Sequence, residues 1–358
     1  MLFPSGVAPV RKLPDLGRIL AAHSGGNRYR LVEIILIEPT NMKKTIILSA
    51  VAVAMGGAAQ AQFSYNNGDL LIGFRSSSAA KDLVVDIGAA SSYASGSSRI
   101  TLSGTKFTSS QLTYALGSST WDGANFSAFA DDAATDTLWV TAPRAPFFVK
   151  SAAWVPQSDN NQSITESKIE GIGQASAIEG GQLATGANNT TTAIAYANTL
   201  SISGGSSYSK GVESVSAEGS PIGNFRGTFQ GNVENALPTG FATGGTPVIS
   251  DLYSLVPGAG SAGYLGYFTF LPSGTFTFTP SAFSIPQPKL SIVSSGGVNT
   301  ISFSSVSGIN YTLLSSTTVN APLSTWSVVG SSVVTGNGAT KSFSDSPADA
   351  TYYILVAY

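Results

Sequence analysis

Three aspartates stand close together in the middle of the chain, and carboxylate oxygens are the ligands that hard cations prefer. Asp131, Asp132 and Asp136 form the densest acidic group of the sequence. A turning backbone with several carboxylates is typical of calcium sites, but the segment from 131 to 136 lacks the D-x-D-x-D-G order of a calcium loop. A plain surface loop is therefore the competing interpretation. Calcium, held by these three residues, is the one candidate cofactor.

A second pair of carboxylates lies in an alternating apolar and polar segment. Asp82 and Asp86 are four residues apart, so in a strand they share one face. Glycosidases use two carboxylates about 5–9.5 Å apart, which keeps a carboxylate-dependent carbohydrate-active enzyme as an alternative function. The other interpretation of this pair is a solvated polar strand face.

The groups behind most other hydrolytic mechanisms are missing. The single histidine is His23, and the chain has no cysteine. Beyond residue 61 these absences exclude a Ser-His-Asp triad, a cysteine nucleophile, an imidazole base and a histidine–cysteine zinc site. Two Ser-x-x-Lys matches occur, Ser78–Lys81 and Ser207–Lys210. In so serine-rich a chain we interpret both as loop serines beside a solvated lysine, and we expect no catalytic residues.

The positions that could do chemistry follow a segment with the features of an export signal. Met42 is followed by Lys43 and Lys44, by an apolar run over 46–55, and by the A-x-A pattern at 59–61. This order predicts a signal peptide at 42–61, and the run is shorter than the roughly 20 residues that span a bilayer. We expect translation to begin at Met42, residues 1–41 to be a misassigned extension, and the mature protein to be extracellular or at the cell surface.

Composition and charge limit the kinds of molecule that the protein is expected to bind. Charged residues make up 11% of the chain, against about a quarter in ordinary globular domains. Seven basic but only three acidic residues precede residue 62, so the remainder is mildly acidic and has no basic cluster. Nucleic acid and anionic lipid surfaces are therefore not expected as partners. A polar, weakly charged surface suits contact with extracellular polysaccharide or matrix.

The elements that must position these residues are predominantly strands. Alternation over 69–75 and 82–87 predicts two half-buried strands, and 264–279 predicts a hairpin with Phe268 and Phe270 facing Phe276 and Phe278. One short helix is predicted at 109–116, with a serine cap and Gly117 as its stop. Residues 157–250 are expected to form strands with long loops.

The sequence predicts an all-β protein with two β-domains. A large β-sandwich-like domain is expected at 62–283, followed by a proline-rich linker at 284–288. About seven short β segments then fill 289–358, a count and spacing typical of a small immunoglobulin-like or fibronectin-like sandwich.

Several of these segments resemble a known group of proteins. The main-domain segments are Leu70–Arg75, Leu83–Gly88, Asp251–Tyr253 and Tyr264–Phe268. They look like uncharacterised secreted β-rich exoproteins of verrucomicrobial bacteria, many of which carry a PEP-CTERM tail that this chain does not show. The terminal segments Leu290–Ile292, Ile301–Phe303, Gly308–Tyr311, Ser324–Trp326 and Tyr352–Ile354 are similar to a small module common in such proteins. The resemblance implies structural motifs and no catalytic residues.

The leading functional hypothesis is a secreted or cell-surface structural or adhesive protein without catalysis. The carboxylate-dependent carbohydrate-active enzyme is one alternative. An outer-membrane β-barrel is another, because Tyr352, Ile354, Val356 and Tyr358 alternate up to an aromatic end.

Overall fold

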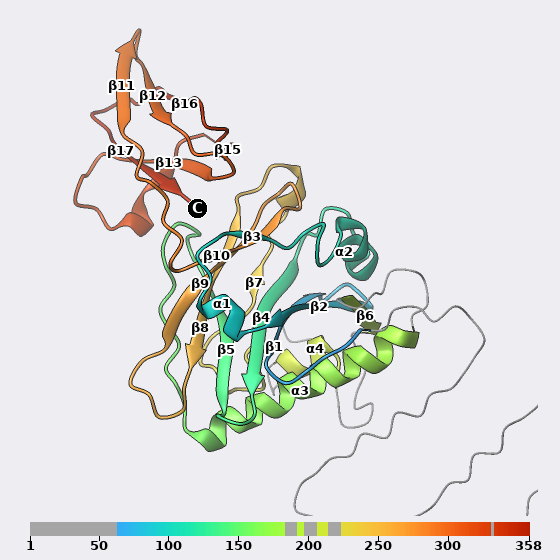
Figure 1. Cartoon of the computed structure of the whole chain (residues 1–358). Coiled ribbons are helices and arrows are strands. Elements are labelled where there is room, and N and C mark those ends of the chain that lie inside the picture. Colours follow the sequence, from blue (N-terminus) through green and yellow to red (C-terminus); the bar gives the residue numbers. More distant parts are fainter. Residues whose placement is uncertain (1–62, 183–191, 197–205, 214–222, 331–332) are drawn as a thin grey trace, which may run out of the picture. The chain divides into compact units, whose positions relative to one another are not determined.

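The structure, a computed structural model, describes residues 63–182, 192–196, 206–213, 223–330 and 333–358 (Figure 1). The expected extension at 1–41 and the expected signal peptide at 42–61 lie outside the described residues. Strands dominate the regular structure and every strand pair is antiparallel, which confirms the all-β fold class. Within the described part, no helix is both long and apolar enough to cross a membrane.

The larger assembly is one ten-stranded sheet. Its strand order is β3-β10-β9-β8-β5-β4-β1-β2-β6, with β7 paired to β4. The bounds are β1 Asp69–Ser76, β2 Lys81–Ala89, β3 Ile100–Thr101, β4 Ala124–Asp132, β5 Thr137–Pro143, β6 Thr192–Tyr196, β7 Asn235–Ala236, β8 Val248–Leu255, β9 Gly263–Phe270 and β10 Phe276–Pro280. Four hairpins, β1–β2, β4–β5, β8–β9 and β9–β10, join neighbours in sequence, and the other five pairings of the described sheet, such as β1–β4 and β5–β8, join strands that are further apart in the chain.

Both faces of this sheet are covered. On β1, Leu70, Ile72 and Phe74 pack into one hydrophobic cluster, as the alternation predicts. Leu71, on the opposite face, packs into a second cluster. Because helices cover this second face as well, the expected solvated strand face is wrong: Asp82 is 0% exposed and Asp86 only 9%.

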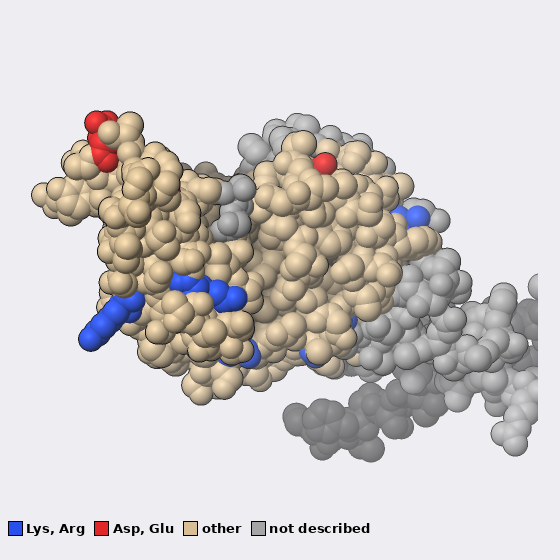
Figure 2. All heavy atoms as spheres, turned by 90° about the horizontal axis from the view of Figure 1, so that it is seen from above, with Lys and Arg blue, Asp and Glu red and all other residues tan. Residues whose placement is uncertain are grey.

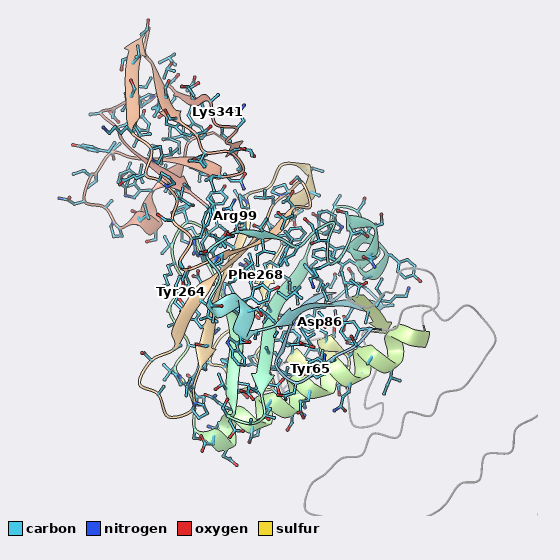
Figure 3. All side chains as sticks on the ribbon, in the orientation of Figure 1. Tyr65, Asp86, Arg99, Tyr264, Phe268 and Lys341 are labelled. Atoms are coloured by element: carbon cyan, nitrogen blue, oxygen red, sulfur yellow. The ribbon has the colours of Figure 1, made fainter. Side chains whose placement is uncertain are left out.

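The hairpin at 264–279 is confirmed in its register. Phe270 pairs with Phe276 and Phe268 with Phe278 across β9 and β10, and the two pairs pack among further aromatic rings of the first cluster. Figure 3 shows Phe268 inside this part of the fold. Gly274 has a φ of +83°, which the tight turn requires and other residues rarely adopt.

The predicted short helix is also present. Helix α2 spans Ser109–Leu116, and Gly117, in the left-handed conformation, ends it. Its cap is Thr108, one residue earlier than expected: the threonine side chain accepts from the backbone N–H of Gln111, whose side chain returns a bond to the Thr108 N–H. Helix α1, Ser91–Ala94, and the 3₁₀ turn η1, Phe241–Thr243, are the other short helical turns that contribute to the first cluster.

Helix α3, Asp159–Gln182, is the main departure from the sequence prediction. The expectation of strands and loops over 157–250 is wrong here. Ile169, Ile172 and Ala175 recur at helical spacing and are fully buried, but serines, asparagines and glycines between them mask the pattern. The helix packs against β4, β5, β6 and the short helix α4, Tyr208–Val212, and it covers the second face of the sheet (Figure 1).

Residues 290–357 form two smaller sheets. The first has the order β11-β12-β16, and the second the order β14-β13-β15 with β17 paired to β13. The bounds are β11 Leu290–Ser295, β12 Val298–Ser304, β13 Asn310–Ser316, η2 Leu323–Thr325, β14 Ser327–Val328, β15 Val334–Thr335, β16 Thr340–Asp345 and β17 Tyr352–Ala357. A shared hydrophobic cluster, including Ile301, Leu313 and Phe343, holds the two sheets together.

Candidate functional site

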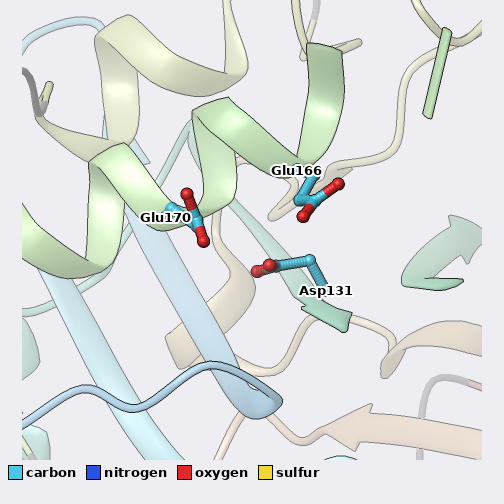
Figure 4. A group of neighbouring side chains, drawn as sticks. All are labelled: Asp131, Glu166 and Glu170. Carbon is cyan, nitrogen blue, oxygen red and sulfur yellow. The ribbon is translucent and has the colours of Figure 1, made fainter. Parts of the chain in front are cut away.

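The acidic group predicted at 131–136 lies on the β4–β5 hairpin, directly beneath α3. Asp131 stands near the end of β4 and is 0% exposed. From α3, Glu166 and Glu170 approach it, as Figure 4 shows. One carboxylate oxygen from each of the three residues lies within 4.8 Å of the others. We call Asp131, Glu166 and Glu170 the carboxylate cluster.

Asp131 is held in place by two donors near the start of the described chain. Tyr65 Oη donates to Asp131 Oδ1 at 2.9 Å, and Asn67 Nδ2 donates to Oδ2 at 3.0 Å. The same amide lies 3.4 Å from Glu170 Oε1. Burial raises the pKa of Asp131 to about 7; the two hydrogen bonds lower it and the nearby charge of Glu170 raises it further.

Glu166 adds a second buried acid. Glu166 is only 8% exposed. Burial raises the pKa of Glu166 to about 7, helped by a hydrogen bond with the Asp136 carboxyl and by the charges of Asp131, Asp136 and Glu170. Like charges this close disfavour full ionisation of the group, so the cluster retains protons up to neutral pH.

The three residues predicted as calcium ligands lie in different surroundings. Asp131 is the centre of the cluster, and Asp136 reaches it through Glu166. Asp132 does not take part: its carboxylate accepts from the Ala134 N–H and the Thr135 hydroxyl, both at 3.0 Å, and so fixes the hairpin turn. Of the three predicted calcium ligands, only Asp131 belongs to the carboxylate cluster, and the calcium assignment stays a prediction.

Sequence reasoning missed Glu166 and Glu170 because it missed α3. Their spacing of four residues puts both on one helical face, and that signal is readable once a helix is assumed. As oxygen donors that converge on one point, Asp131, Glu166 and Glu170 are the residues that would hold a hard cation. The ion pairs found among the described residues all lie elsewhere.

A second charged group is buried further along the same face of the sheet. Arg75 binds Glu234 through Nε at 2.9 Å and through Nη2 at 2.6 Å, and its Nη1 lies 3.2 Å from Glu213 Oε1. Tyr208 Oη donates to Glu234 Oε1 at 2.6 Å. We call these four residues the arginine network. Charges buried this deeply must be paired and hydrogen-bonded, and here they are.

The Ser207–Lys210 match lies beside this network. The expectation of a loop serine and a solvated lysine is wrong. Ser207 lies directly before α4, Lys210 lies within this helix, and both are buried. The Ser207 side chain caps the helix by accepting from the Lys210 N–H. The Lys210 ammonium pairs with Glu213 at 3.7 Å, and a paired ammonium is not a general base.

Asp82 is another buried acid on this face. It accepts from the Ser209 N–H and hydroxyl, each at 2.7 Å. Burial raises its pKa to about 7 against these two bonds. Its place in the helix–sheet contact gives it a structural role. The other serine match, at Ser78, forms a turn in which its hydroxyl bonds that of Ser76 at 3.0 Å, and Lys81 lies over the Tyr114 ring.

No protein-family model, curated protein or solved structure matches this chain. The resemblance to verrucomicrobial exoproteins stays a prediction. The functional argument rests on the side chains described above.

Proposed function

We propose that this chain is an exported structural or adhesive protein that contacts neutral polysaccharide or extracellular matrix and performs no catalysis. The observation that carries the proposal is the location of its charges. Ten charged residues are at least nine-tenths buried: Asp69, Arg75, Asp82, Asp86, Asp131, Glu166, Lys210, Glu213, Glu234 and Asp251. Because the whole chain has only 38 charged residues, burying ten of them leaves the described surface sparsely charged.

The surface reflects that distribution. Figure 2 shows one face on which almost all of the described surface is neither acidic nor basic. Such a face has no strong field to steer a charged partner. Serine, threonine and asparagine side chains supply donors and acceptors without charge, which suits a neutral hydroxyl-rich polymer.

The buried acids support a role without catalysis. Asp131 has no exposed surface, and both of its oxygens already accept hydrogen bonds. Glu234 and Asp82 are equally enclosed by donors of the protein itself. A catalytic acid must reach its substrate, and these side chains reach only their neighbours.

The test is binding to insoluble polysaccharides as a function of salt. The chain from Gln62 onward is incubated with cellulose, chitin, xylan and native matrix, and the bound fraction is measured at low and high sodium chloride. We expect saturable binding to at least one neutral polymer that salt leaves unchanged, because no ionic contacts are involved. No binding to any polymer, or binding that high salt abolishes, would contradict the proposal.

A carbohydrate-active enzyme is the second candidate, and the convergence of carboxyls favours it. A pKa near 7 is what a general acid of a glycosidase needs, and Asp131 and Glu166 both have one. Release of reducing sugar from the same polymers, abolished in Glu166→Gln, would establish this candidate in place of the first. No release from any of them counts against it.

A further inference from the structure

The core between the two C-terminal sheets becomes polar at one end. On β13, Leu313 is fully buried, and Ser315 follows two residues later on the same face of the strand. On β16, buried Phe343 is followed in the same way by half-buried Asp345. Along both strands, which belong to different sheets, the side chains change from apolar to polar at the same end of the core.

A depression of about 380 Å³ opens at this end. Six of its lining residues carry hydroxyls: Ser315, Ser316, Thr317, Thr325, Ser327 and Thr351. Asp345 and Asp349 add two carboxylates, and no lysine or arginine lines it. Its volume lies in the lower part of the roughly 300–1,000 Å³ range of small-molecule sites.

The floor of the depression is fixed by a chain of hydrogen bonds between the sheets. Tyr353 Oη, on β17, donates to Asp345 Oδ2 at 2.8 Å. It accepts in turn from Asn299 Nδ2 on β12 at 3.0 Å, and Ser294 Oγ bonds Asn299 Oδ1 at 2.6 Å. Asp345 is therefore held in one orientation before any ligand arrives.

Other groups at the rim keep their hydrogen-bonding capacity. Within the described part of the chain, Asp345 Oδ1, the Asp349 carboxylate and the hydroxyls of Ser315 and Ser327 have no protein partner. Ser315 lies directly opposite Ser327 in the β13–β14 pairing. The depression thus presents acceptors and hydroxyls along one short edge.

We propose that this depression binds a neutral saccharide unit, an inference that rests on the proposed function and assigns it a site. Carboxylates accept from sugar hydroxyls in charge-assisted bonds, which are about twice as strong as neutral ones. Serine and threonine hydroxyls both donate and accept. Two carboxylates without a neighbouring cation disfavour an anionic sugar, so the expected unit is uncharged.

Calorimetric titration with neutral oligosaccharides tests this site. Gluco-, manno- and xylo-oligosaccharides are titrated into the chain from Gln62 onward and into Asp345→Asn and Asp349→Asn. Each substitution preserves side-chain shape and removes a charged acceptor, so we expect binding at least about tenfold weaker. The matched control is Asp159→Asn, the same change at an exposed position of α3, and it should bind like the unaltered chain.

The outcomes separate the site from the function. Unaltered binding in both variants would place the saccharide elsewhere and overturn this inference, while the proposed function would stand. No binding of any neutral saccharide by the unaltered chain, together with no binding of the polymers, would overturn both. If Asp345→Asn fails to fold, Asp349→Asn carries the test, because the Asp349 side chain is exposed and makes no bond in the described structure.

Discussion

At the scale of single residues, the carboxyls of Asp131 and Glu166 are acids whose charged forms the fold disfavours. Their pKa values, about 7, lie above the ordinary values of 3.8 and 4.5. At these two carboxyls the folded protein therefore binds more protons than the unfolded chain between about pH 4 and pH 7. Their contribution to the free energy of unfolding is largest below this window, falls as pH rises through it, and levels off above it.

Substitution of one acid should flatten this dependence. In Glu166→Gln one charge can no longer form, so we expect a protein about 1–3 kcal/mol more stable than the original at pH 8 and similar to it at pH 4. Urea unfolding at a series of pH values measures this difference. Asp159→Asn, on the exposed part of the same helix, should change the profile far less. Equal stability of Glu166→Gln and the unaltered chain at pH 8 would show that the cluster is not destabilising.

The calcium prediction is tested on the same residues. A hard cation would replace the protons of the cluster and relieve the repulsion between its carboxylates. Millimolar calcium at pH 8 should then raise the Tm of the unaltered chain and leave that of Glu166→Gln nearly unchanged. If the unaltered chain has the same Tm with calcium and with a chelator, the carboxylates of Asp131 and Glu170 are not calcium ligands.

The arginine network predicts a large loss when one partner is removed. Arg75→Met leaves Glu234 buried without its guanidinium, while Glu213 keeps Lys210, and an unpaired buried charge of this kind costs about 3–5 kcal/mol. Urea unfolding of the single variant should show this loss. The double variant Arg75→Met, Glu234→Met should lose less than the sum of its single changes; additive losses would contradict the pairing.

At the scale of elements, the sequence predicts those helices and strands whose signals lie within a few neighbouring residues. The hairpin at 264–279 and the helix at 109–116 follow from turn residues, capping and alternation within a few positions, and both are present. Helix α3 was missed because its buried positions are separated by polar and glycine residues. Asp131 is predicted from the close spacing of three aspartates in the sequence. Its partners Glu166 and Glu170 could not be predicted, because the helix that carries them has no clear short-range signal.

Gly173 of α3 has a packing reason that predicts a mutational effect. A Cβ at Gly173 would meet the ring of Tyr65, which lies against α3 in Figure 3. Gly173→Ala should therefore destabilise the protein by about 1–3 kcal/mol, even though alanine favours helices. Gly260→Ala, where a Cβ would meet nothing within 4 Å, is the control. A Gly173→Ala protein with unchanged urea midpoint would contradict this contact.

At the scale of the whole molecule, many of the few charged side chains are buried, and the described surface is sparsely charged. The sheet is covered on both faces, so buried polar strand positions need partners. Arg75 obtains them from Glu234 and from Glu213 at the end of α4, Asp82 from Ser209 of α4, and Asp131 from Tyr65 near the start of the described chain. On the outside, hydroxyls and amides surround a few widely spaced charges such as Lys150 and Arg226. That division explains why composition indicated a weak surface field while strand alternation wrongly predicted solvated aspartates.

Export is the property on which the extracellular setting depends, and it predicts a defined processed species. When the chain is produced from Met42 in a bacterial host, we expect export and an intact mass that begins at Gln62, after the A-x-A pattern of 59–61. Ala61→Arg should block cleavage, because the last position of the pattern accepts only small residues. Gln60→Arg, at the variable middle position, is the control and should be processed normally. A cytoplasmic protein of uncut mass would contradict export, and with it the contact with extracellular polysaccharide.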